Sequence, residues 1–155
     1  MDELERIKIE IGIREPLLHP SLTSETHTII VNPFSRRPLL PAFTVQAMDM
    51  KEAYAEKVRA ALTRKEPAIR DLFDMLYAVR KMNLDLVDHD FLVMVKQKLD
   101  VPGNTPVDIS LEYKRELDRQ LEGQLRPVLR PADFDSFNME EAFELIVPIA
   151  KAVSG

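Results

Sequence analysis

Lys57, Arg64, Asp71 and Asp74 are four charged residues in the middle of the chain whose spacing could place them in one site. Lys57 falls within the apolar stripe of a predicted helix, where lysine is rarely buried without a partner. An ammonium in that position needs either a neighbouring carboxylate or an anionic ligand. Arg64, seven residues later, projects from nearly the same side of the helix. The pattern predicts that these cations are paired with carboxylates or with a bound anion.

The first element that must position this group is a helix predicted to begin at Met50. Asp49 and Glu52 have the spacing of a capping box, which fixes the start and therefore the rotation of the helix. Its apolar residues recur at the spacing of an amphipathic helix. They are Met50, Ala53, Tyr54, Val58, Ala61 and Leu62. This rotation turns Lys57 inward, toward a predicted sheet.

The second element is a helix predicted to begin at Pro67, a residue that is well placed as the first of a helix. Its buried stripe consists of Ile69, Leu72, Phe73, Leu76 and Val79. Asp71 and Asp74 lie on one side next to that stripe, so the two helices bring carboxylates and cations together. Arg70 and Asp74 also have the i, i+4 spacing of a surface ion pair. A purely structural role for these charges therefore stays open.

The same stretch, residues 51–81, resembles a signature of the nucleotidyltransferase-like AbiEii/AbiGii toxins of type IV toxin–antitoxin systems. The resemblance is carried by Ala55-Glu56-Lys57, Arg64-Lys65 and Arg70-Asp71-Leu72-Phe73-Asp74. It implies that Lys57 is catalytic and binds the triphosphate of a nucleotide, and that Asp71 aids catalysis or orients Lys57. It further implies that Arg64, Arg70 and Asp74 support substrate binding.

Residues 6–14 have the alternation of a strand, with isoleucines at 7, 9, 11 and 13 on one face and charged residues on the other. By pattern alone this is a half-buried strand with a solvated charged face. Polymerase-β-like nucleotidyltransferases carry a metal-binding carboxylate on a strand flanked by apolar residues, and Ile9-Glu10-Ile11 is similar. The resemblance implies that Glu10 is a catalytic residue and a metal ligand.

Two other motifs of such enzymes, a Gly-Gly or Gly-Ser turn and an Asp-x-Asp strand, would precede Glu10, and nine residues precede it here. The later strings Asp88-His89-Asp90 and Asp133-Phe134-Asp135 are predicted to lie at helix starts and in loops. The chain therefore resembles the C-terminal part of an AbiEii-like nucleotidyltransferase, incomplete or inactive alone. Mg²⁺ would bind only with a complementing segment, and a nucleoside triphosphate would be the substrate.

Two further hypotheses stay open. In one, the chain is a non-catalytic relic that binds a nucleotide or a protein as a partner or regulatory module. In the other, it is a structural domain in which Asp71 or Asp74 neutralises Lys57. An incomplete sheet would leave an open edge. A homodimer, a separately encoded N-terminal-half protein or an antitoxin would be the partners.

Composition fits one globular domain of 155 residues, with 45% hydrophobic and 30% charged residues. The chain has no cysteine and no apolar run of membrane-spanning length, so we expect a cytoplasmic protein without a disulfide framework. A net charge of −5 argues against broad binding to DNA.

The predicted fold is α+β. A partial polymerase-β-like sheet of three or four strands, including residues 6–14, 27–31 and 41–48, packs on the helix pair within residues 1–82. A helical subdomain follows in residues 83–155 of the single domain. Its predicted helices cover residues 88–99 and 105–121 and begin again at Met139, with a linker at residues 123–131.

Overall fold

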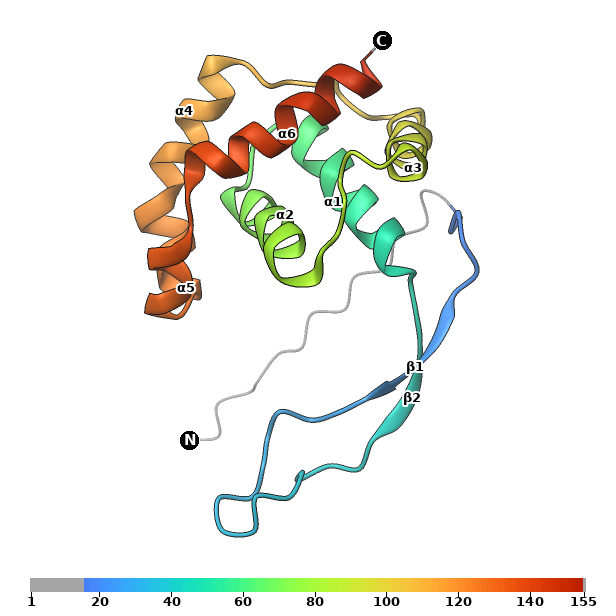
Figure 1. Ribbon diagram of the computed structural model, residues 1–155, viewed down its shortest axis with the longest axis vertical. Helices are drawn as coiled ribbons and strands as arrows, with labels where there is room; N and C mark the ends of the chain where they lie inside the picture. Colours follow the sequence, from blue (N-terminus) through green and yellow to red (C-terminus); the bar gives the residue numbers. More distant parts are fainter. Residues whose placement is uncertain (1–15, 155) are drawn as a thin grey trace, which may run out of the picture.

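The computed structural model describes residues 16–154, in which a β-hairpin is followed by a helical body (Figure 1). The hairpin consists of β1 (Leu22–Thr26) and β2 (Phe43–Ala47). The helices are α1 (Met50–Thr63), α2 (Ile69–Met82), α3 (His89–Leu99), α4 (Leu111–Gln120), α5 (Pro131–Ser136) and α6 (Met139–Val153). A π-helical turn, η1 (Leu121–Leu125), and a 3-10 turn, η2 (Arg126–Val128), follow α4. The predicted strand at residues 6–14, with Glu10, lies outside the described residues.

The α+β class is confirmed, but the predicted packing of a sheet on the helix pair is wrong for the described residues. β1 and β2 pair antiparallel, with Leu22 opposite Ala47, and extend away from the helices (Figure 1). No residue from 16 to 51 is buried. The hairpin therefore contributes nothing to the core of the described chain.

Of the two predicted strands in the described region, the one at residues 41–48 is confirmed as β2 and the one at residues 27–31 is wrong. The strand that pairs with β2 is Leu22–Thr26 instead. Residues 27–31 face residues 38–42, which include Pro38 and Pro41, and these prolines lack the N–H groups that a ladder needs. An isolated bridge between Val31 and Pro38 is the pairing found there.

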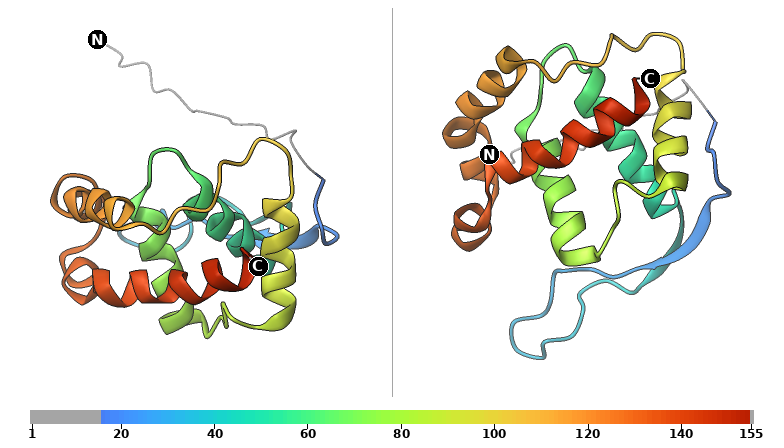
Figure 2. Two further views of the ribbon diagram at one scale, coloured as in Figure 1. Left: turned by 90° about the horizontal axis from the view of Figure 1, so that it is seen from above. Right: turned by 45° about the horizontal axis from the view of Figure 1, so that its top comes forward.

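The core lies among four helices, with α1 against α2 and α3, and α6 against α2 and α3. In Figure 2, α6 runs across one side of this group. The fully buried side chains at its centre include Val58 of α1, Leu72 of α2, Phe91 of α3 and Ile146 of α6. Burial of such side chains stabilises a fold by ~1.5–3 kcal/mol each. This core fixes the relative positions of α1 and α2, which carry the predicted site.

The start of α2 is capped by a distant side chain. The helix begins at Ile69, two residues after the predicted start at Pro67, and its N-cap residue, Ala68, has no side-chain acceptor. Gln120 of α4 replaces it: Ile69 N donates to Gln120 Oε1 at 3.0 Å, and Gln120 Nε2 donates to the Pro67 carbonyl at 2.8 Å. Sequence patterns near Pro67 could not show this contact.

The predicted helix at residues 105–121 begins six residues late, at Leu111 after the N-cap Ser110. Residues 105–110 instead pack along the end of α1. The Thr105 hydroxyl donates to the Thr63 carbonyl, and Asp108 N donates to the Leu62 carbonyl at 2.9 Å. These tertiary hydrogen bonds outweigh the local helix-start signal.

The predicted linker at residues 123–131 is also wrong, because η1 and η2 occupy most of it. Pro131 then begins α5, so Asp133-Phe134-Asp135 lies within a short helix. Proline is tolerated in the first turn of a helix, where its missing N–H would have no helical partner. The helices predicted at residues 88–99 and from Met139 are confirmed as α3 and α6.

Candidate functional site

Lys57 of α1 and Asp74 of α2 form a direct ion pair across the two helices. Lys57 Nζ lies 2.6 Å from Asp74 Oδ2. The two side chains are 39% and 38% exposed, so the pair lies at the edge of the helix interface and is open to solvent. A pair this exposed contributes only ~0–1 kcal/mol to stability.

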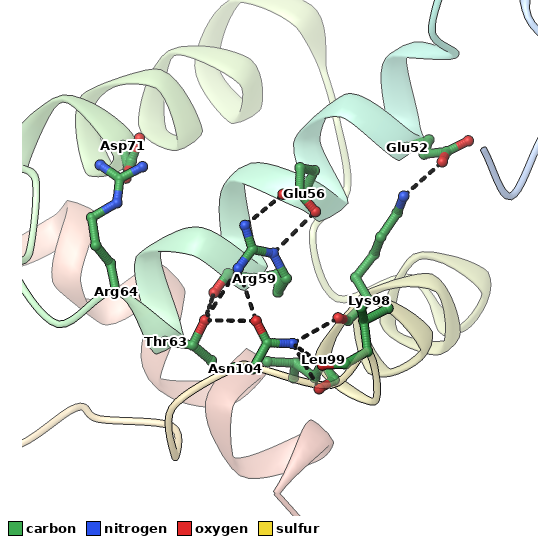
Figure 3. Close-up of polar contacts among 10 residues, drawn as sticks. Glu52, Glu56, Arg59, Thr63, Arg64, Asp71, Lys98, Leu99 and Asn104 are labelled. Atoms are coloured by element: carbon green, nitrogen blue, oxygen red, sulfur yellow. Dashed lines mark hydrogen bonds and ion pairs between the residues drawn. The ribbon is translucent and has the colours of Figure 1, made fainter. Parts of the chain in front are cut away.

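A second ion pair lies at the junction that connects these helices. Arg64, which follows the last residue of α1, places a guanidinium nitrogen 3.2 Å from Asp71 Oδ2 in the first turn of α2 (Figure 3). The Arg64 side chain is 45% exposed, whereas that of Asp71 is nearly buried. Asp71 Oδ2 accepts no hydrogen bond, so its contact with Arg64 is electrostatic. One oxygen of this carboxylate therefore keeps its acceptor capacity.

Burial raises the pKa of Asp71 above its ordinary value, and the nearby charge of Asp74 raises it further. The positive charges of Arg64, Lys57 and Arg70 oppose this shift without cancelling it. Ionised Asp71 is therefore held at a cost in free energy. Groups with such perturbed pKa values are concentrated at functional sites.

The structure brings Lys57, Arg64, Asp71 and Asp74 to one place, where the second half of α1 and its C-cap residue face the first half of α2. Of the two carboxylates expected to neutralise Lys57, Asp74 contacts it, whereas Asp71 contacts Arg64. Arg70 is exposed and lies close enough to act on the pKa of Asp71. Among the described residues it forms no ion pair with Asp74, which is bound to Lys57 instead.

Two tyrosines border this group of charges. Tyr54, one helical turn before Lys57, donates from its hydroxyl to Met82 Sδ at 3.4 Å. Burial raises the pKa of Tyr54, Asp74 raises it further and Lys57 opposes the shift. Tyr113 of α4 is buried behind the site, and its hydroxyl donates to the Ala61 carbonyl at 2.6 Å. Burial, together with Asp71 and Asp108, raises the pKa of Tyr113.

The predicted inward orientation of Lys57 is wrong because α1 is rotated. Its buried residues are Glu52, Ala55, Val58, Ala61, Leu62 and Thr63. Met50 is exposed and Tyr54 is half-buried. The rotation places Lys57 at the border of the buried face, toward α2.

The buried face of α1 includes one member of a buried ion pair that sequence reasoning missed. Lys98 Nζ of α3 lies 2.7 Å from Glu52 Oε1, and both side chains are almost fully buried (Figure 3). Glu52 also accepts hydrogen bonds from the backbone N–H groups of Leu18, at 2.8 Å, and His19, at 2.9 Å. The pair thus attaches the segment before the hairpin to both helices.

A signal for this pair was present in the sequence. Lys98 lies seven residues after Phe91, on the same buried stripe of α3 as Met94 and Val95. Glu52 was assigned to a capping box, of which one half is confirmed: Glu52 N donates to Asp49 Oδ1 at 3.2 Å. Burial alone would raise the pKa of Glu52. The hydrogen bonds from Lys98, Leu18 and His19, together with the charge of Lys98, hold it below its ordinary value.

A network around Asn104 fixes α1 against the end of α3 (Figure 3). Asn104 Nδ2 donates to the carbonyls of Lys98, Leu99 and Val101 at 3.0, 2.8 and 3.0 Å. Its Oδ1 accepts from Arg59 at 2.9 Å, and Arg59 is held in turn by Glu56. Such bonds satisfy the last carbonyls of a helix. All these polar groups have partners, so the network is structural.

Mg²⁺ does not fit the described carboxylates at this site. Hard cations of this kind need several oxygen ligands that converge. Asp71 and Asp74 each face a cation of the protein, Arg64 and Lys57 respectively. Between residues 16 and 154, no group of three His, Cys, Asp or Glu residues is placed to hold a metal ion.

Comparison with protein-family models identifies the class of protein. The model described as "Nucleotidyl transferase AbiEii toxin, Type IV TA system" matches residues 2–146. The chain therefore belongs to the AbiEii nucleotidyl transferase toxin family, as its signature residues predicted. Searches of curated proteins and of solved structures gave no match.

Family membership implies that an antitoxin accompanies the protein, as expected for a type IV toxin–antitoxin system. It does not assign roles to individual side chains. None of the helices in residues 16–154 is long and apolar enough to cross a membrane.

Proposed function

We propose that this protein binds the triphosphate of a nucleotide at Lys57 and Arg64 and takes part in nucleotidyl transfer. The observation that carries the proposal is the two neighbouring ion pairs, Lys57–Asp74 and Arg64–Asp71, between the second half of α1 with its C-cap residue and the first half of α2. In each pair a partly exposed cation contacts a carboxylate of α2. The cation is Lys57 of α1 in one pair and Arg64, the residue after α1, in the other. The family to which the chain belongs supplies the reaction class.

Exchange of a carboxylate for a phosphate would cost little at Lys57. The Lys57–Asp74 pair is solvent-exposed and therefore weak, so its loss costs at most ~1 kcal/mol. Hydrogen bonds from an ammonium or a guanidinium to phosphate oxygens are charge-assisted and short. The planar guanidinium of Arg64 can bind two oxygens of one phosphate. In the free protein, Asp74 holds Lys57 in place for the incoming ligand.

Asp71 is the residue to which we assign a role in proton transfer. Its pKa is raised by burial, and an elevated carboxyl pKa suits a general base that works near neutral pH. Oδ2 is buried and accepts no hydrogen bond, so it has capacity for a proton. Arg70, exposed and close to Asp71, would add positive charge at the border of the site.

The proposed role of Glu10 as a metal ligand rests on the resemblance of residues 9–11 to the carboxylate strand of polymerase-β-like enzymes. In this proposal Glu10 is one of the carboxylates that would hold the metal ion. Bound Mg²⁺ would neutralise charge on the triphosphate. The described side chains would bind and orient the phosphates.

Binding of a protein through the hairpin is the second candidate function. The hairpin segment, residues 20–47, exposes large apolar side chains, among them Ile29 at 96% and Phe34 at 95%. Within residues 16–154, both outer edges of the two-stranded sheet are also unpaired. Antiparallel edges can pair about a two-fold axis, so the partner that we propose is a second copy of this chain. Other proteins that add a strand would be detected as heteromeric complexes.

A thermal-shift titration tests triphosphate binding. Ligand at a hundred times its Kd stabilises a protein by ~2.7 kcal/mol, which raises Tm by roughly 5–10 °C for a chain of this size. We expect at least one of the four ribonucleoside triphosphates to raise the Tm of the wild-type protein and not that of Lys57→Met. The unliganded Tm should change by less than ~4 °C, because the lost pair is exposed.

Lys51→Met is the matched control. Lys51 lies on the same helix, is 49% exposed and also faces an aspartate of another segment, Asp88, at 3.6 Å. This variant should keep the ligand-induced shift. Retention of the full shift by Lys57→Met would contradict the role of Lys57, and absence of any shift in the wild-type protein would contradict triphosphate binding.

A further inference from the structure

An aromatic pocket lies between α2 and α5, one helical turn from the proposed phosphate site. Its volume is about 130 Å³, and its walls include the rings of Phe73, Tyr77 and Phe137. The buried Leu76 also lines it, as do Lys81 and Ser136. Pockets for drug-sized ligands measure ~300–1,000 Å³. This one is therefore of the size that suits a single flat ring system.

The three rings form a connected wall. Phe73 lies 6.2 Å from Tyr77 and 5.9 Å from Phe137 between ring centroids, with interplanar angles of 34° and 53°. These separations are typical of favourable aromatic pairs. Tyr77 is nevertheless 45% exposed, so part of its ring remains open to a ligand. A nucleobase stacks on such surfaces whatever its identity.

The polar groups of the pocket fall into two sets. Arg80 is bound to Glu141 and donates to the Ser136 carbonyl at 2.8 Å, and Asp133 is held by Arg130 at 2.6 Å. The Tyr77 hydroxyl and the Lys81 ammonium, in contrast, form no hydrogen bond or ion pair in the described part of the chain. They remain available to the polar edge of a ring or to a ribose.

The distance along α2 fits a nucleotide that spans both sites. Tyr77 follows Asp74 by three residues, so the two side chains are neighbours on the helix surface. Asp71 and Tyr77 are six residues apart, which corresponds to ~9 Å along the helix. In a nucleoside triphosphate, a ribose separates the base from the phosphates over a comparable length. Tyr54 of α1 contacts Met82 of α2, and both Asp74 and Tyr77 raise the pKa of Tyr54. The two sites therefore lie on one continuous surface.

We propose that the pocket formed by Phe73, Tyr77 and Phe137 binds the nucleobase of the nucleotide whose triphosphate is held by Lys57 and Arg64. This inference rests on the proposed function and extends it. Stacking provides affinity without strong selection among bases, because every base has a π-face. The Tyr77 hydroxyl and the Lys81 ammonium would add modest selectivity among bases.

Calorimetric titration of the full chain with three ligands tests this proposal: ATP, inorganic tripolyphosphate and adenosine. Tyr77→Ala removes the exposed ring and should weaken ATP binding about tenfold, the effect expected for loss of one stacked base. It should leave the Kd for tripolyphosphate unchanged, whereas Lys57→Met should weaken both. Tyr77→Phe keeps the ring and should retain most of the ATP affinity.

Val93→Ala is the control for loss of an exposed apolar side chain. Val93 lies on α3 and is 44% exposed, close to the value for Tyr77. This variant should bind ATP and tripolyphosphate like the wild-type protein.

The outcomes separate the pocket from the phosphate site. Equal ATP affinity in Tyr77→Ala, with binding that still requires Lys57, would overturn the base pocket and leave the proposed function standing. Adenosine binding that requires Tyr77, without tripolyphosphate binding, would support the pocket and refute the phosphate site. Failure of all three ligands to bind the wild-type protein would overturn both proposals.

Discussion

The buried ion pair between Glu52 and Lys98 should be a large determinant of stability. Glu52→Gln keeps the size of the side chain and one oxygen acceptor for the backbone N–H groups of Leu18 or His19, but removes the negative charge. It leaves the ammonium of Lys98, whose side chain is 1% exposed, without this carboxylate. Loss of one partner of a buried ion pair costs ~3–5 kcal/mol. Each kcal/mol corresponds to ~2–4 °C in Tm at this chain length, so we expect Tm to fall by roughly 6–20 °C.

The pH dependence of this effect follows from the lowered pKa of Glu52. A carboxyl group whose pKa is lower in the folded than in the unfolded state contributes stability that is complete above the unfolded value. That contribution is lost as pH falls through the folded-state pKa. The Tm difference between the wild-type protein and Glu52→Gln should therefore be constant from pH 7 down to about 5. It should shrink below the ordinary value of 4.5.

Differential scanning calorimetry between pH 3 and pH 7 measures both effects. Glu144→Gln is the control, because Glu144 is exposed on α6 and forms no ion pair among the described residues. A surface change of this kind should stay within ~0.5 kcal/mol of the wild-type protein. If Glu52→Gln also stayed within that range, or if its effect grew toward low pH, the reasoning about this buried pair would be refuted.

Two further predictions concern Asp71 and the hairpin. Because the pKa of Asp71 is raised, its ionisation opposes folding, and stability is lost as pH rises through the folded-state value. Asp71→Asn should therefore melt at or above the wild-type Tm at pH 7, with the difference closing below pH 3.8, and a lower Tm at pH 7 would contradict this. Multi-angle light scattering should show a dimer that Ile29→Asp and Phe34→Asp convert to a monomer, and a wild-type monomer would refute pairing through the hairpin.

Local signals in the sequence were sufficient to predict where α1 begins but not which face it buries. The start at Met50 followed from Asp49, whose side chain accepts from Glu52 N as expected for an N-cap. The buried face includes Glu52, whose burial is tolerable because Lys98, forty-six positions away, forms an ion pair with it. Hydrophobic periodicity treats a glutamate as a surface residue and so placed Lys57 too far inward.

The composition of the candidate site was predictable, and its pairing was not. Lys57, Arg64, Asp71 and Asp74 meet because two consecutive helices with a short connection must be neighbours. Which carboxylate faces which cation depends on the crossing geometry and rotation of the helices. That geometry is set by packing against α3 and α6, which the sequence pattern does not specify.

The segments predicted wrongly are those in which distant partners decide the conformation. Residues 27–31 have a strong β pattern but face prolines, whereas β1 forms from residues with a usable partner in β2. Residues 105–110 have a helix-start pattern but bind the end of α1. In both cases a tertiary contact replaced the local preference.

The most direct test of the central claim observes the Lys57 ammonium itself. ¹⁵N-lysine NMR of the wild-type protein, with the Lys57 signal assigned through Lys57→Arg, follows its Nζ resonance as a nucleoside triphosphate is added. We predict that this resonance shifts as Lys57 exchanges Asp74 for phosphate oxygens, while the buried Lys98 resonance stays in place. A Lys57 resonance that does not move at saturating triphosphate would contradict the proposed site.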